Sequence, residues 1–102
     1  DRKINWYKSA ESIKNLIQAC LSGFGAWTKI RDKRLWINKV IIGKEINEKC
    51  NRGTVIKIDS KGIAVAAKDK VLLIIVAIVN ERQITHQDLV KKLKINEGDI
   101  FN

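Results

Sequence analysis

Residues that could act as nucleophiles or acid–base catalysts are few in this chain, and none has a suitable partner nearby. The lone histidine, His86, lies at the start of a predicted helix, where we expect a solvated capping-turn residue. The four serines are accounted for as cap, helix-surface or turn residues. The acidic residues are scattered among lysines, as in solvated surface pairs. We therefore predict no catalytic residue in this chain.

The sequence also lacks the spacings that hold metals and nucleotides. Cys20 and Cys50 stand apart with no neighbouring histidine, and two such ligands are too few for a zinc site. Free thiols are favoured over a single disulfide. The glycines form neither a dinucleotide-binding fingerprint nor a phosphate-binding loop. We predict no metal ion and no cofactor within this domain.

Basic side chains interleaved with tryptophan are the remaining feature that could form a functional site. They surround a predicted hairpin that carries Trp27 and Trp36, and a second cluster ends the last predicted helix. Such a surface can follow a phosphate backbone, and an exposed tryptophan can stack on a base. Aromatic residues on the strands of a small domain are more often buried, so we expect both tryptophans in the core. The predicted nucleic-acid-binding residues are Lys29, Arg31, Lys33, Arg34, Lys39, Arg82, Lys91 and Lys92.

Charge agrees with a polyanionic partner but does not require one. Twenty Lys and Arg against eleven Asp and Glu give a net charge of +9, which speeds encounter with nucleic acid. The alternative is a surface that only keeps the protein soluble. The longest apolar run, Val71 to Val79, is about half of a membrane span. No apolar leader is visible, so we expect a soluble, cytoplasmic protein without membrane contact.

At 102 residues the chain has room for one domain, predicted over 1–102, and its lack of methionine suggests a fragment. Two amphipathic segments, capped by Ser9 and Thr85, predict helices at about 9–22 and 86–93. Between them, β-branched runs and polar turns predict a barrel over about 26–79 plus 100–101, with 43–52 as a loop. This order indicates a mainly β protein, a small open β-barrel of the oligonucleotide-binding type with one N-terminal and one short C-terminal helix.

Short motifs along the chain resemble a known family in collinear order. Ile4-Asn5-Trp6, with Ser9 and Ala10 following, is similar to the opening of the formyltransferase C-terminal domain. Further similar motifs are Gly25-Ala26-Trp27-Thr28, Lys33-Arg34-Leu35, Gly53-Thr54-Val55, and the closing set of Thr85, Asp88, Leu89, Gly98 and Asp99. The resemblance covers nearly the whole chain.

The resemblance implies a function that the residues alone do not. In this family, methionyl-tRNA formyltransferases transfer a formyl group from 10-formyltetrahydrofolate to methionyl initiator tRNA. Their chemistry and their folate lie in an N-terminal catalytic domain, and the C-terminal domain is an open Greek-key β-barrel that helps to hold the tRNA through a basic surface. The resemblance thus implies a non-catalytic domain whose partners are initiator tRNA and the catalytic domain of the same enzyme.

Departures from the family pattern keep a second function open. Leu21 to Phe24 stand where the family has Pro-Trp-Pro, and Asn80-Glu81-Arg82 stand where it has Gly-Lys-Lys. Sugar-nucleotide formyltransferases and formyltetrahydrofolate dehydrogenases share this domain without binding tRNA. The alternative is therefore a structural or dimerisation domain in such an enzyme.

Overall fold

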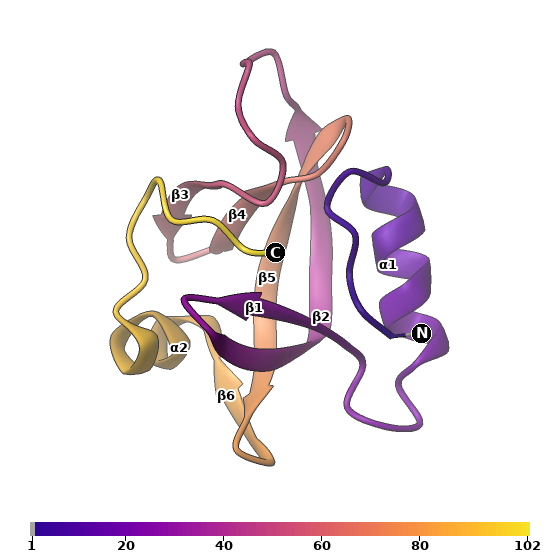
Figure 1. The fold of residues 1–102 in the computed structure, drawn as a ribbon, viewed down its shortest axis with the longest axis vertical. Coiled ribbons are helices and arrows are strands. Elements are labelled where there is room, and N and C mark those ends of the chain that lie inside the picture. Colours follow the sequence, from indigo (N-terminus) through magenta and orange to yellow (C-terminus); the bar gives the residue numbers. More distant parts are fainter. Residues whose placement is uncertain (1) are drawn as a thin grey trace.

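The computed structural model describes residues 2–102, in which six antiparallel strands lie between two helices (Figure 1). The helices are α1 (Ala10–Ala19) and α2 (His86–Leu93). The strands are β1 (Ala26–Ile30), β2 (Lys33–Glu45), β3 (Val55–Asp59), β4 (Gly62–Ala66), β5 (Lys70–Val79) and β6 (Arg82–Thr85). The prediction of a mainly β protein with one N-terminal and one C-terminal helix is confirmed.

The strands follow the order β1-β2-β5-β4-β3, and β6 pairs with the free part of β5. Strands β3, β4 and β5 are consecutive hairpins, and β2 returns beside β5 across the long 46–54 connection, which makes a Greek key. Strands β1 and β3 end the order without pairing with each other, so the sheet is open. The continuous apolar run of β5 is explained by its central position between β2 and β4.

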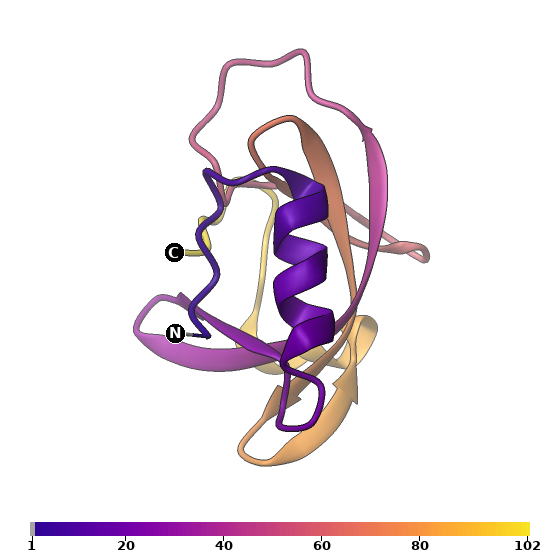
Figure 2. The same cartoon turned by 90° about the vertical axis from the view of Figure 1, so that its right-hand side faces the viewer.

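Helix α1 covers the inner side of β2, as Figure 2 shows. Its buried residues, Ala10, Ile13 and Ile17, recur at the spacing of one helical face. The predicted helix over 9–22 is too long at its C-terminal end. The Cys20 carbonyl accepts the amides of Gly23 and Gly25, so the chain turns back instead of adding another helical turn.

Strand β2 is longer than predicted and takes the first residues of the expected 43–52 loop. Glu45 pairs with Lys70 on β5, where opposite charges face each other. Gly43 allows this extension because a Cβ at that position would lie 2.5 Å from the Cγ2 atom of Val71. Lys44 and Glu45 are polar because this end of β2 is exposed to solvent, and their polarity does not end the strand.

Strand β6 was missed by the sequence prediction, which treated its residues as a connection. Asn80 and Glu81 both have positive φ, as expected of a two-residue hairpin turn that matches the twist of its strands. The strand has only four residues, mostly exposed, and it pairs with β5 alone. Its apolar pattern is therefore too short to recognise.

Both termini run along the free edge of β1. The Trp27 amide donates to the Arg2 carbonyl at 2.9 Å, and the Trp27 carbonyl accepts the Ile4 amide at 2.8 Å. Lys29 exchanges both backbone hydrogen bonds with Asn102, at 2.7 and 2.9 Å. The predicted last strand at 100–101 is a single bridge between Thr54 and Ile100. These contacts satisfy the backbone groups that an edge strand otherwise leaves open.

Candidate nucleic-acid interface

The β1–β2 hairpin turns one face inward and one outward. Ala26, Thr28 and Ile30 are buried, whereas Trp27 and Lys29 between them are half-buried. The same alternation on β2 buries the two partners Leu35 and Ile37. The outward residues Trp27, Lys29, Arg34 and Trp36 are called the hairpin face below. The prediction that both tryptophans belong to the core is wrong, because they lie on the outward side of this alternation.

Backbone hydrogen bonding brings the side chains of the hairpin face close together. Trp27 lies opposite Trp36, and Lys29 lies opposite Arg34. The backbone groups of Trp27 and Lys29 bond to the two termini and not to β2. Both pairs are therefore of the non-hydrogen-bonded kind, in which facing side chains approach most closely. Two cations, Lys29 and Arg34, are consequently held on the same face of the hairpin.

Arg34 lies over the ring of Trp27, with its guanidinium carbon 3.8 Å from the ring centroid. Trp27 is a diagonal cross-strand neighbour of Arg34, within reach of a long side chain. Attraction to the ring face and repulsion from Lys29 both favour this position. Lys3 also approaches the Trp27 ring, at 5.4 Å, a contact that nothing in the sequence indicated. Trp36 is packed edge-on against Phe24.

Arg31, at the tip of the hairpin, binds the end of α2. Its guanidinium donates to the Asp99 carboxylate at 2.7 Å and to the carbonyls of Leu93 and Lys94. The Asn96 amide and then the Arg31 guanidinium hold the pKa of Asp99 below its usual value. Arg31 therefore ties the hairpin to the end of α2. Its part in nucleic-acid binding stays a prediction.

This tie joins the two basic clusters that the sequence predicted separately. A hollow at the hairpin tip, called the basic hollow below, is lined by Lys33, Arg34, Val79, Asn80, Lys92 and Leu93. A neighbouring hollow shares Lys33 and Lys92 and adds Lys94, which the sequence places in the basic cluster at the end of the last predicted helix. Three predicted residues from β2 and α2 thus line one surface.

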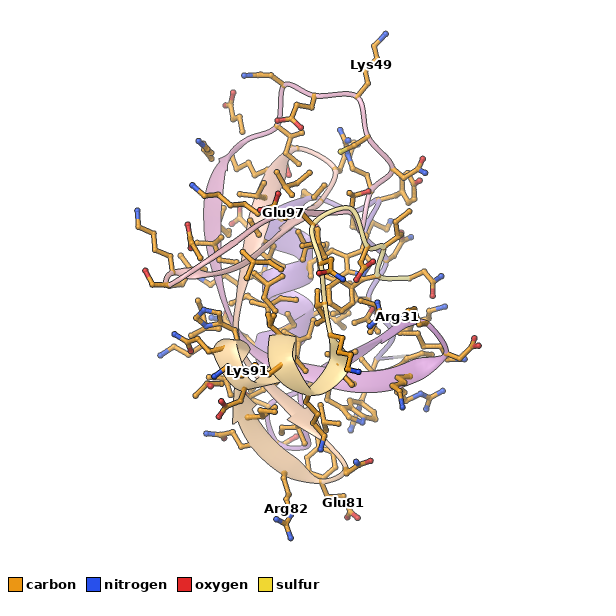
Figure 3. All side chains as sticks on the ribbon, turned by 90° about the vertical axis from the view of Figure 1, so that its left-hand side faces the viewer. Arg31, Lys49, Glu81, Arg82, Lys91 and Glu97 are labelled. Carbon is orange, nitrogen blue, oxygen red and sulfur yellow. The ribbon has the colours of Figure 1, made fainter. Side chains whose placement is uncertain are left out.

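The other predicted residues lie outside the basic hollow. Lys39 is exposed at the β-bulge of β2. Lys91 projects from α2, and Arg82 points away at the far tip of the β5–β6 turn (Figure 3). Lys49, which was not predicted as a site residue, lies at the opposite end of the molecule in the same view.

Most of the predicted residues have no acidic partner within residues 2–102. Over residues 2–102, ion pairs join Arg31 to Asp99 and Lys57 to Asp59, and no others form. Seven of the eight predicted residues are therefore outside any ion pair in this part of the chain. Their charge is not neutralised internally, which is the condition for attracting an anion.

The remaining candidate side chains have structural roles. His86 is buried, not solvated as predicted, and its Nε2 lies 2.9 Å from the Asp59 carbonyl, where it can act only as the donor. Trp6 is buried and donates to Thr28 at 3.0 Å. In the described part of the chain, no three His, Cys, Asp or Glu residues lie close enough to hold a metal ion. No helix there is long and apolar enough to cross a membrane.

Known proteins resemble the chain over almost its whole length. It is 33% identical to the methionyl-tRNA formyltransferase of Clostridium beijerinckii over 99 residues, which is 96% of this chain and 32% of that protein. It is 36% identical to the enzyme of the same name from Sulfurihydrogenibium sp. over 103 residues, covering 97% of this chain and 32% of that protein. The chain therefore spans about a third of the length of these relatives. Residues 1–94 match the family described as "Formyl transferase, C-terminal domain", and the chain belongs to that family.

Proposed function

We propose that this chain is the non-catalytic C-terminal domain of a 10-formyltetrahydrofolate-dependent formyltransferase and helps to bind initiator tRNA. The formyl acceptor is methionyl initiator tRNA, and the folate and the catalytic residues belong to the N-terminal catalytic domain of the same protein. The proposed location is the cytoplasm. The relatives that carry the name methionyl-tRNA formyltransferase support this choice of enzyme.

The joined basic surface is the observation that carries the proposal. Lys33, Arg34 and Lys92 come from two elements far apart in sequence and line one hollow. None of the three forms an ion pair within residues 2–102, so each can exchange its counterion for a phosphate. A surface that serves only solubility does not require its cations to converge in this way.

Binding of initiator tRNA at several salt concentrations tests the proposal. The Lys33→Gln/Lys92→Gln variant should bind more weakly and lower the slope of log K against log salt by about two units, one for each lost phosphate contact. Lys49→Gln is the matched control because it removes one positive charge at the other end of the molecule (Figure 3). Absence of tRNA binding at low salt, or an equal loss per charge in the control, would contradict the proposal.

An apolar strip that is exposed at Ile41, half-buried at Leu73 and buried at Ala64 favours a second candidate, a structural or dimerisation domain of a sugar-nucleotide or folate formyltransferase. Ile41 is 50% exposed and lies directly opposite Leu73, which in turn pairs with Ala64. These residues continue across three strands on the outer side of the sheet. A dimer in sedimentation equilibrium that Ile41→Lys dissociates, together with no affinity for tRNA, would favour this candidate over the first.

A further inference from the structure

We infer that the Arg34–Trp27 stack is a binding site for an unpaired RNA base, with the adjacent phosphate in the basic hollow. This inference rests on the proposed function, since it names the part of an RNA that the surface recognises. It distinguishes a single-stranded or looped segment from a regular duplex, a distinction that positive charge alone does not make.

The geometry of the stack presents one planar surface to solvent. The guanidinium carbon of Arg34 lies 3.8 Å from the Trp27 centroid, a distance of direct contact with the ring face. Arg34 is exposed, and it forms no ion pair within the described chain. The side of the guanidinium turned away from Trp27 is therefore available. Unpaired bases stack on guanidinium planes as they do on aromatic rings.

The backbone fixes this surface before any ligand binds. Trp27 lies on a strand whose edge is covered by the N-terminal segment, with hydrogen bonds of 2.8 and 2.9 Å. Lys29, directly opposite Arg34, adds a second positive charge on the same face. Like charges held across a strand pair repel each other, and a bound phosphate relieves that repulsion.

Arg34 also connects the stack to the basic hollow, since it is one of the residues that line the hollow, together with Lys33 and Lys92. A base on the guanidinium and a phosphate between these lysines are consecutive parts of one nucleotide. A duplex keeps its bases inside the helix and can use only the phosphate half of this arrangement.

Arg34→Lys separates base stacking from phosphate binding, because it keeps the positive charge and removes the planar guanidinium group. The probes are a short single-stranded RNA of mixed sequence and the duplex that it forms with its complement, both at low salt. We expect the variant to lose at least about fivefold in affinity for the single strand and to keep its affinity for the duplex. Arg52→Lys, the same exchange at an arginine that bonds to the carbonyls of Cys50 and Lys68 and is not a predicted binding residue, should change neither affinity.

A second variant tests the stack while leaving Arg34 itself unchanged. Trp27→Leu removes the support beneath the guanidinium, keeps every charge and should reduce the same single-strand preference, provided that thermal unfolding shows a folded protein. If Arg34→Lys binds both probes like the parent chain, or weakens both equally, the base site is wrong and the proposed function stands. If the parent chain binds neither probe nor tRNA, the proposed function itself fails.

Discussion

At the scale of single residues, Arg31 decides which surface the other cations form. Its guanidinium holds the Asp99 carboxylate and two carbonyls at the end of α2, and these bonds place Lys92 beside Lys33. The sequence placed Arg31 among residues that bind nucleic acid, because nothing local indicates a partner 68 residues away. Its part in binding stays a prediction, whereas its part in joining hairpin and helix is visible.

Arg31→Ala should lower the free energy of unfolding by about 1–2 kcal/mol, because charged hydrogen bonds to carbonyls and to a carboxylate are lost together. The half-exposed pair with Asp99 contributes only part of this loss, and a double-mutant cycle with Asp99→Ala should give a coupling of about 0.5–1 kcal/mol. Urea unfolding measures both quantities. Arg82→Ala is the control, with an expected change below about 0.5 kcal/mol, and an equal loss there would contradict the role of Arg31.

Exposure of the tryptophans could not be read from residue types. Trp6, Trp27 and Trp36 have the same composition signal, yet only Trp6 is buried. Trp27 and Trp36 lie on strands whose inward sides carry the buried neighbours Ala26 and Leu35, whereas Trp6 lies in the segment before α1, outside any strand. Alternation in the sequence shows that two faces exist but does not say which one packs inward when tryptophans occupy one and small or aliphatic residues the other.

At the scale of elements, α1 depends on a side chain from the turn between β4 and β5. The Asp69 carboxylate accepts the amide of Ala10 at 3.0 Å, across 59 residues of sequence. This hydrogen bond satisfies one of the open amides at the first turn of the helix, in addition to the Ser9 cap. The Ser9 cap was predicted because it is local, but the Asp69 contact was not, because only the folded sheet brings it to the helix.

The same contact makes stability depend on pH. The Ala10 amide lowers the pKa of Asp69 below its ordinary value of 3.8, so the unfolded chain binds a proton more readily than the native one. The stabilisation is complete above pH 3.8 and is lost as the pH falls through the lower native value. Asp59 and Asp99 act in the same direction, since each accepts a backbone amide.

Asp69→Asn should therefore reduce the loss of stability in acid, because the amide oxygen can still accept the hydrogen bond but does not titrate. Urea midpoints at neutral pH and at pH values on both sides of 3.8 measure how steeply stability falls with pH in each variant. Asp32→Asn is a matched control, since Asp32 is exposed in the hairpin turn. A slope that Asp32→Asn alters as much as Asp69→Asn would exclude this linkage.

Local patterns determined most elements, and long-range pairing determined the rest. The apolar run of β5 and the cap of α2 by Thr85 are readable within a few residues. Strand β6, by contrast, exists because β5 extends beyond β4 and offers an unpaired edge to Arg82–Thr85. The Asn80–Glu81 turn was the local indication of that hairpin.

At the scale of the whole molecule, the C-terminal segment connects the two ends of the open sheet. The Val55 amide donates to the Asp99 carbonyl at 2.8 Å, and the Phe101 amide donates to the Gly53 carbonyl at 2.8 Å. Asn102 then bonds to Lys29 on β1. The ring of Phe101 lies between these contacts, fully buried and 6.0 Å from that of Trp6. The segment thus acts on the core as well as on the backbone of both edges.

Phe101→Ala should therefore destabilise the molecule by about 3–5 kcal/mol, the range for removing a buried aromatic ring from a packed core. For a domain of this size such a loss lowers the melting temperature by more than about 10 °C. Ile100→Ala is the control, because Ile100 is the preceding residue, is 42% exposed and leaves the backbone bridge to Thr54 in place. If the segment stabilised the sheet only through its backbone, the two variants would melt together. A large difference between them locates the contribution in the ring, which makes these last residues part of the core that supports the hairpin and its basic surface.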